Sequence, residues 1–179
     1  MSIRTLLCHI ALVLGALPAP GGAAPASYEA APDRSAWLSQ HDGAACHLSH
    51  QVPLFGSVTF SREPSGRSLL TIAPVRPFGS EVKLVLAVRG TRWQPLPEQE
   101  LALLYLYPAS PLLRIDGAYV EHLLTALEQG RTAVIRFVGG FDGEHELALS
   151  PVGFRHGWAD YLSCAVAIAA TASEADDGF

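Results

Sequence analysis

Four residues with metal-binding side chains lie close together in the first third of the sequence: His41, Cys46, His47 and His50. Imidazole nitrogens and thiolate sulfurs are the ligands that zinc prefers in proteins. His47 and His50 are three residues apart, so in an extended segment their side chains point to opposite faces. The spacing therefore favours surface or hydrogen-bonded histidines, and we predict no metal site.

A second group of reactive side chains lies near the end of the sequence. It contains His145 and His156, with the carboxylates of Asp142, Glu144 and Asp160 nearby. Histidines beside carboxylates serve as general acids and bases in hydrolases. The sequence has no Gly-x-Ser-x-Gly elbow for a serine nucleophile, and no carboxylate spacing favours a glycosidase pair. We therefore predict a non-enzymatic protein without a cofactor, and a small secreted hydrolase is the least favoured alternative.

Two arginines in the last third of the sequence, Arg131 and Arg136, can contribute to a partner-binding patch. Arginines in such positions are more often solvated or paired with a neighbouring acid, here Glu128. The sequence leaves both interpretations open.

The first 26 residues have the features of a cleavable signal peptide. Arg4 precedes a short apolar core over residues 6–17, and Ala24-Pro25-Ala26 matches the small-x-small pattern of a cleavage site. The core is shorter than the roughly 20 residues that span a bilayer. We predict secretion, a mature chain that starts at Ser27, and no transmembrane segment after cleavage.

The mature chain is acidic. Without Arg4 it has 11 basic and 17 acidic residues, a formal charge of −6, and a single lysine, Lys83. This balance disfavours nucleic acid as a partner. A length of about 150 residues suits one domain with a substantial core.

Two cysteines remain in the mature chain, because Cys8 is removed with the signal peptide. Secretion places Cys46 and Cys164 in a compartment that permits disulfides. A redox-active pair is the rival interpretation, but the sequence has no Cys-x-x-Cys motif. We predict a structural disulfide between Cys46 and Cys164.

The elements that position these residues are mostly strands. Apolar alternation and turn residues predict an extended N-terminal arm, whose Trp37 packs over the sheet, and then strands over residues 57–61, 68–75, 81–88, 101–107, 112–115, 133–138 and 146–150. Asp116 and Gly130 bracket a helical apolar pattern, and a second such pattern covers residues 158–170. We predict an α+β domain over residues 27–172, with an antiparallel, partly barrel-like sheet, one inserted helix and one C-terminal helix. An acidic disordered tail follows over residues 173–179.

Several motifs together resemble the N-terminal domain of the MotY family of flagellar motor proteins. Each motif is weak alone, but their order and spacing over nearly the whole mature chain are specific. The motifs are Tyr28-x-Ala30-x-Pro32-x-x-Ser35-x-Trp37, Cys46-x-Leu48-x-His50-x-x-Pro53-x-Phe55-Gly56-x-x-x-Phe60-Ser61, Arg76-Pro77-x-Gly79, Asp116-Gly117 with residues 124–131, and Ala148-Leu149-Ser150-x-Val152-x-Phe154 leading to Cys164.

The resemblance implies a non-enzymatic assembly role in the periplasm. Members of the family form a ring with MotX around the flagellar basal body and help to capture the stator, and their N-terminal domain makes the docking contacts. Family members also carry an OmpA-type peptidoglycan-binding domain, whereas this sequence ends at Phe179. We therefore expect basal-body, MotX-like or stator partners and no peptidoglycan-binding domain of its own. A solo periplasmic binding module for a small apolar ligand or another envelope protein is the alternative.

Overall fold

The computed structural model of the chain describes residues 26–31, 35–108, 110–138 and 143–176. Almost all of the predicted signal peptide over residues 1–26 therefore lies outside the described residues. The same holds for Pro32 of the N-terminal arm, for Asp142, and for the end of the predicted tail over residues 177–179.

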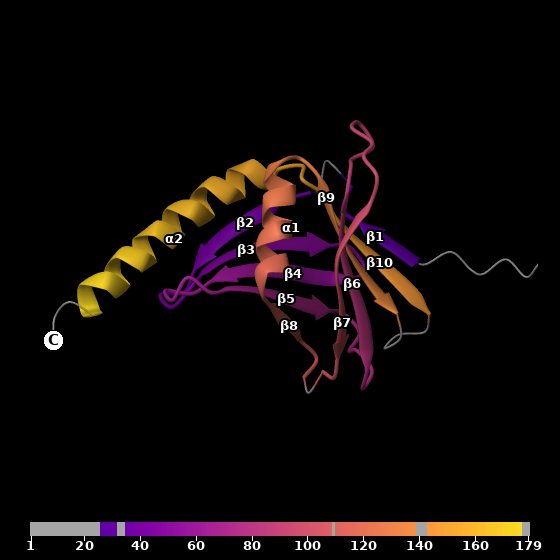
Figure 1. The fold of residues 1–179 in the computed structure, drawn as a ribbon, viewed down its shortest axis with the longest axis horizontal. Coiled ribbons are helices and arrows are strands. Elements are labelled where there is room, and N and C mark those ends of the chain that lie inside the picture. The colour runs from indigo at the N-terminus through magenta and orange to yellow at the C-terminus, as the bar shows by residue number, and fades with distance from the viewer. Residues whose placement is uncertain (1–25, 32–34, 109, 139–142, 177–179) are drawn as a thin grey trace, which may run out of the picture.

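The strands of the described residues form two five-stranded sheets (Figure 1). Sheet A has the order β1 (Ala26–Glu29), β10 (Glu144–Leu149), β9 (Thr132–Val138), β6 (Val82–Arg89) and β7 (Gln99–Leu106). Sheet B has the order β2 (Trp37–His41), β3 (Cys46–Val52), β4 (Gly56–Arg62), β5 (Ser68–Pro74) and β8 (Leu113–Asp116). The chain passes between the two sheets repeatedly, so neither sheet is a domain of its own.

This arrangement confirms an α+β protein rich in strands, but not the partly barrel-like closure. The two sheets remain separate, and each has two end strands in the part of the chain that the structure describes. Almost every pairing is antiparallel, as predicted, but β1 pairs with β10 in parallel. The partners in that pair are more than 100 residues apart, with Ala26 opposite His145, and no local pattern indicates such a pairing.

The predicted N-terminal arm contributes a strand to each sheet. β1 extends sheet A, and β2 extends sheet B through a register in which Trp37 lies opposite His50. Trp37 is buried within the core rather than packed over a finished sheet. Its indole Nε1 donates a hydrogen bond to the carbonyl oxygen of Ser150, 2.9 Å away, which ties β2 to the end of β10.

Helix α1 (Ala118–Glu128) packs its apolar side against strands of both sheets. The predicted face is buried: Val120, Leu123, Leu124 and Leu127. Each fully buried aliphatic side chain of this kind contributes about 1.5–3 kcal/mol.

The two ends of α1 show one wrong and one correct prediction. Asp116 does not cap the helix, because it belongs to β8, its carboxylate pairs with Arg67, and Gly117 is the N-cap. At the other end Gly130 has a φ of 78°, and the N–H groups of Gly130 and Arg131 donate to the carbonyls of Leu127 and Ala126. This is a Schellman motif, which glycine favours because it adopts a positive φ without strain.

Helix α2 (Phe154–Asp176) begins earlier and ends later than predicted. Phe154 follows a tight turn in which its N–H donates to the carbonyl of Pro151. Gly157 in the first turn is buried, and a Cβ there would meet the backbone of Trp37, so glycine allows α2 to approach β2 closely. The helix includes residues 173–176, the first part of the predicted tail. In Figure 1 its C-terminal end projects away from both sheets.

The core lies between the inner faces of the two sheets and the helices. Its largest fully buried side chains come from both sheets and both helices: Phe60, Leu48, Leu70 and Ile72 of sheet B, Phe137, Leu84 and Leu86 of sheet A, Leu123, Leu124 and Leu127 of α1, and Tyr161 and Phe154 of α2. Among the described residues, neither helix is both long enough and apolar enough to cross a membrane.

Candidate functional site

The first cysteine motif lies where sheet B meets α2. Cys46 is the first residue of β3 and Cys164 lies in the middle of α2, and the structure joins them by a disulfide with their Cα atoms 5.9 Å apart. The bond closes a loop of 118 residues that contains most of the fold. The predicted pair is therefore at disulfide distance, and it anchors α2 to the start of β3.

The histidines of this motif point to different faces of β3. His50 is buried on the inner face, where its ring stacks on Trp37 and its Nδ1 lies 3.0 Å from the carbonyl oxygen of Ala36. Burial lowers the pKa of His50, so the neutral imidazole is favoured in the folded chain. His47 lies on the outer face, and His41 lies exposed at the end of β2.

No metal cluster forms from these side chains. Within the described residues, no group of three or more His, Cys, Asp or Glu side chains could hold a metal ion. The sulfur of Cys46 is occupied by the disulfide, and alternation along β3 separates His47 from His50. The predicted opposite orientation of His47 and His50 is therefore confirmed.

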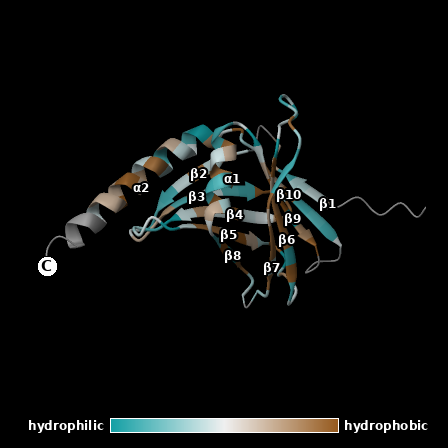
Figure 2. Cartoon of the chain, in the orientation of Figure 1, coloured by the Kyte–Doolittle hydropathy of each residue, from teal (hydrophilic) through white to brown (hydrophobic). Residues whose placement is uncertain are grey.

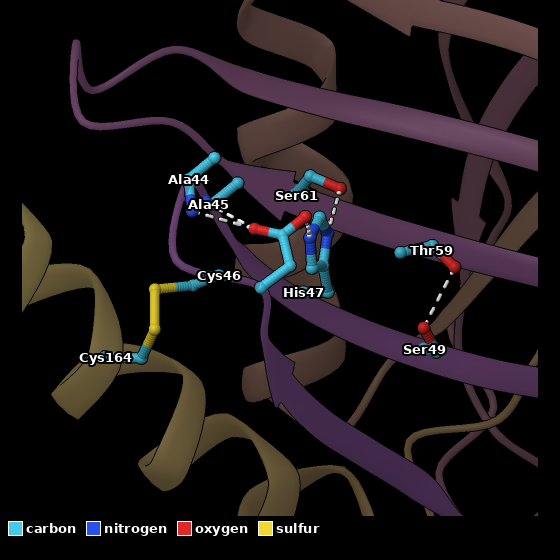
Figure 3. A network of polar contacts seen from close by, with 9 residues as sticks. Ala44, Ala45, Cys46, His47, Ser49, Thr59, Ser61 and Cys164 are labelled. Carbon is cyan, nitrogen blue, oxygen red and sulfur yellow. Dashed lines mark hydrogen bonds and ion pairs between the residues drawn. A yellow bond between two sulfur atoms is a disulfide. The ribbon is translucent and has the colours of Figure 1, made fainter.

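The outer face of sheet B instead carries a polar chain of contacts that the sequence did not predict (Figure 3). His47 Nε2 lies 3.0 Å from Asp42 Oδ2, and His47 Nδ1 lies 2.8 Å from Ser61 Oγ. A parallel contact joins Ser49 Oγ to Thr59 Oγ1 at 2.9 Å. The pairing of β3 with β4 places His47 directly opposite Ser61. A prediction of which residues pair in this hairpin would have revealed the contact.

Asp42, His47 and Ser61 are the residue types of a hydrolase triad, but Asp42 lies at His47 Nε2 and Ser61 at Nδ1, the reverse of the arrangement in serine proteases. The pKa of the Asp42 carboxyl is held well below its usual range, first by the hydrogen bond from His47 and then by the backbone N–H groups of Ala44 and Ala45. An ionised Asp42 accepts a hydrogen bond from Nε2–H of His47, and His47 Nδ1 faces the Ser61 hydroxyl.

Other features of this chain of contacts favour a structural role. Ser61 is only 7% exposed and lies inside a strand that pairs on both sides, with β3 and with β5. The N–H groups of Ala44 and Ala45 bind Asp42, so they are not available as oxyanion donors. The arrangement closes the turn between β2 and β3 immediately before Cys46.

The described residues considered for the hydrolase alternative lie on two elements, β10 and α2. His145 belongs to β10, where its ring stacks on Tyr28 at 5.9 Å between centroids. His156 and Asp160 are exposed on α2, and Glu144 is exposed at the start of β10. Asp142 lies outside the described residues.

The two arginines singled out in the sequence have different surroundings. Arg136 on β9 pairs with Glu98 and, through Nε at 3.1 Å, with Glu146. Glu146 is largely buried and also pairs with Arg89 at 2.8 Å. The hydrogen bond that Arg136 donates to the Glu98 carboxylate is the main cause that raises the pKa of Arg136. Arg136 is therefore paired with Glu98, just before β7, and with Glu146 of β10, rather than with Glu128. Arg131 is half-buried just before β9.

Exposed aromatic side chains lie at both ends of the β6–β7 hairpin. Among the described residues, the large exposed aromatics are Trp93 (85% exposed), Tyr105 (58%) and Tyr107 (71%). Trp93 lies in the connection between β6 and β7, next to Arg92, whose guanidinium lies 5.7 Å from the indole centroid. The two tyrosines lie at and just beyond the end of β7. The pairing of Tyr105 with Lys83 places both tyrosines at the opposite end of the β6–β7 hairpin from Trp93. We call the exposed indole of Trp93 together with the neighbouring Arg92 guanidinium the aromatic surface.

Comparison with known proteins identifies a family. The family model described as the MotY N-terminal domain matches residues 28–169, which run from β1 to the last turns of α2. No curated protein matches the chain. The family match includes both cysteines, the contacts of Figure 3 and the aromatic surface.

Proposed function

This chain belongs to the MotY N-terminal domain family, and we propose that it acts in the periplasm as a non-enzymatic interaction domain of the flagellar motor. The family is associated with the motor and is not a known enzyme family. In this proposal the chain is exported by its signal peptide, and it contacts basal-body, MotX-like or stator proteins.

The observation that carries the proposal is the extent of the family match. It covers nearly every strand and both helices, so the chain shares the whole domain with the family rather than one motif. A contact surface inherited with the domain would therefore be built from elements that this chain also has.

The aromatic surface supports a protein-binding role. Aromatic residues and arginine are enriched among the side chains that dominate the energy of protein interfaces. An indole that is 85% exposed leaves a large apolar area in contact with water, and burial against a partner would recover that area. Arg92 beside Trp93 adds a charged group that can pair with an acidic partner.

A deletion strain of the source organism tests the proposal. Loss of the chain is expected to reduce swimming in soft agar while electron microscopy still shows assembled filaments. Complementation with the wild-type chain should restore swimming. A deletion strain that swims like its parent would contradict the motor assignment.

A matched pair of variants tests whether the aromatic surface makes the contact. Trp93→Ala should fail to restore swimming although the protein accumulates at the wild-type level. Leu54→Ala is the control, because Leu54 is 90% exposed in a different turn, between β3 and β4. Full swimming with Trp93→Ala would exclude this residue as an interface anchor.

A further inference from the structure

The edge of sheet A at β7 is open. In the part of the chain that the structure describes, β7 pairs with β6 and with no other strand. An end strand has a row of backbone N–H and C=O groups on its free side, which are a template for pairing with another strand. Natural proteins usually protect such an edge with charges, prolines or bulges.

Most of β7 lacks this protection. Residues 101–107 contain no charged residue and no proline, and Glu100 is the only charged residue within the strand. The pairing with β6 has one irregularity, between Leu86 and Ala87, which affects the end of β7 near Glu100. From Ala102 to Leu106 the register is regular, so this segment can accept a further strand. Figure 2 shows mostly hydrophobic residues along β7.

The side chains on the outer face of β7 are apolar and exposed. Leu103 is 44% exposed and Tyr105 is 58% exposed, and both point to the same face because they are two residues apart. On β6 their cross-strand neighbours are Val85 and Lys83, respectively. Leu104 and Leu106 point to the opposite face and pack against the core.

We infer that the occupant of this edge is a second copy of the chain, with the two β7 strands antiparallel about a two-fold axis. An axis beside Leu104 keeps the outer faces of the two sheets on the same side, and it places Leu103 opposite the partner copy's Tyr105 twice. Pairs of an aromatic and an aliphatic side chain in this position stabilise antiparallel sheets.

The charges also fit a second copy. The same axis places Glu100 opposite the partner copy's Pro108, so the two Glu100 carboxylates lie at opposite ends of the joined strands. Lys83 lies on β6, so the two joined β7 strands separate it from its counterpart. No like charges therefore face each other across the joint. The contact is isologous, and two five-stranded sheets become one continuous sheet.

Sedimentation velocity of the purified, disulfide-bonded chain over a dilution series tests the inference. The wild-type chain should show a reversible monomer–dimer equilibrium. Leu103→Lys and Tyr105→Lys should each raise the dimer dissociation constant at least tenfold, because a lysine on an edge strand opposes further pairing. Both side chains are exposed, so circular dichroism should show an unchanged fold.

The control is Val166→Lys, which replaces an even more exposed apolar side chain on α2 and should leave the dimer unchanged. A wild-type chain that is monomeric at every concentration would overturn the inference. A dimer that resists both β7 substitutions, or one that Val166→Lys weakens equally, would also overturn it. The inference does not depend on the proposed motor role, because sedimentation reports self-association whether or not the deletion strain swims.

Discussion

The indole of Trp37 stacks on the imidazole of His50 with 4.5 Å between the ring centroids and 17° between the planes. The two residues face each other across β2 and β3, and Phe154 of α2 approaches the indole edge-on at 5.0 Å. This contact joins the N-terminal strand of sheet B to the start of the last helix. It also makes the protonation of one buried histidine relevant to the whole fold.

The stability of the chain should therefore depend on His50 as pH changes. The pKa of His50 is lower in the folded chain than its ordinary value of 6.5, so the unfolded chain binds more protons between the two values. This contribution to stability is complete above pH 6.5 and is lost as pH falls through that value toward the folded pKa. Each pKa unit of difference corresponds to about 1.4 kcal/mol.

Urea unfolding at several values between about pH 5 and pH 8 measures this effect, since that window brackets an ordinary histidine pKa. His50→Phe keeps a ring against Trp37 and removes the titrating group, so its free energy of unfolding should fall less steeply on acidification. An identical slope in the variant and the wild type would exclude His50 as a source of the dependence.

The disulfide between Cys46 and Cys164 should behave as one unit in a mutant cycle. Cys46→Ser and Cys164→Ser should each lower the free energy of unfolding by about 2–5 kcal/mol, because either change opens the same long loop. The double variant should lose little more than either single variant. Chemical denaturation without reductant measures the free energy of unfolding of the wild type, the two single variants and the double variant. A loss in the double variant equal to the sum of the two single losses would argue against the bond.

Glycine is required at Gly56 for reasons that do not apply at Gly66. Gly56 has a φ of 140°, and a Cβ there would clash with the backbone of Ala73 and Pro74 on the paired strand. Gly66 has a φ of 81°, and a Cβ added there would meet no atom within 4 Å. Gly56→Ala should therefore cost about 3 kcal/mol or more, and Gly66→Ala about 1 kcal/mol. Similar decreases in thermal stability for the two variants would show that the backbone of Ala73 and Pro74 moves to accommodate the added Cβ at position 56.

Ser61 should contribute to stability and not to hydrolysis. Ser61→Ala removes the hydroxyl that faces His47 Nδ1 and should lower the free energy of unfolding by about 1 kcal/mol. Any background hydrolysis of p-nitrophenyl acetate should be the same in the wild type and in the variant. An activity that disappears with Ser61→Ala and with His47→Ala would assign catalysis to the contacts of Figure 3 instead.

Local patterns in the sequence predicted the parts of the fold that depend on neighbouring residues. Alternation located strands such as β4, where Val58 and Phe60 are buried, and helical spacing located the buried face of α1. Gly130 was a correct stop because a Schellman motif is built from consecutive residues. The prediction that Asp116 caps α1 was wrong, because its carboxylate pairs with Arg67, which is distant in the sequence.

Contacts between distant residues account for most of what the sequence did not predict. The parallel pairing of β1 with β10 and the separation into two sheets depend on which strands meet in space. The start of α2 depends on Gly157 fitting against the backbone of Trp37. The contact of His47 with Ser61 follows from the register of β3 and β4, which alternation alone does not set.

The most direct test of the motor assignment is to isolate hook–basal bodies from a strain that produces the tagged chain and to probe them by immunoblotting. A strain that makes the same tagged chain but no basal bodies is the control for contaminating envelope. The proposed function predicts that the chain co-purifies with basal bodies and is absent from the control preparation. A chain found only in the unbound periplasmic fraction, with basal bodies intact, would contradict it.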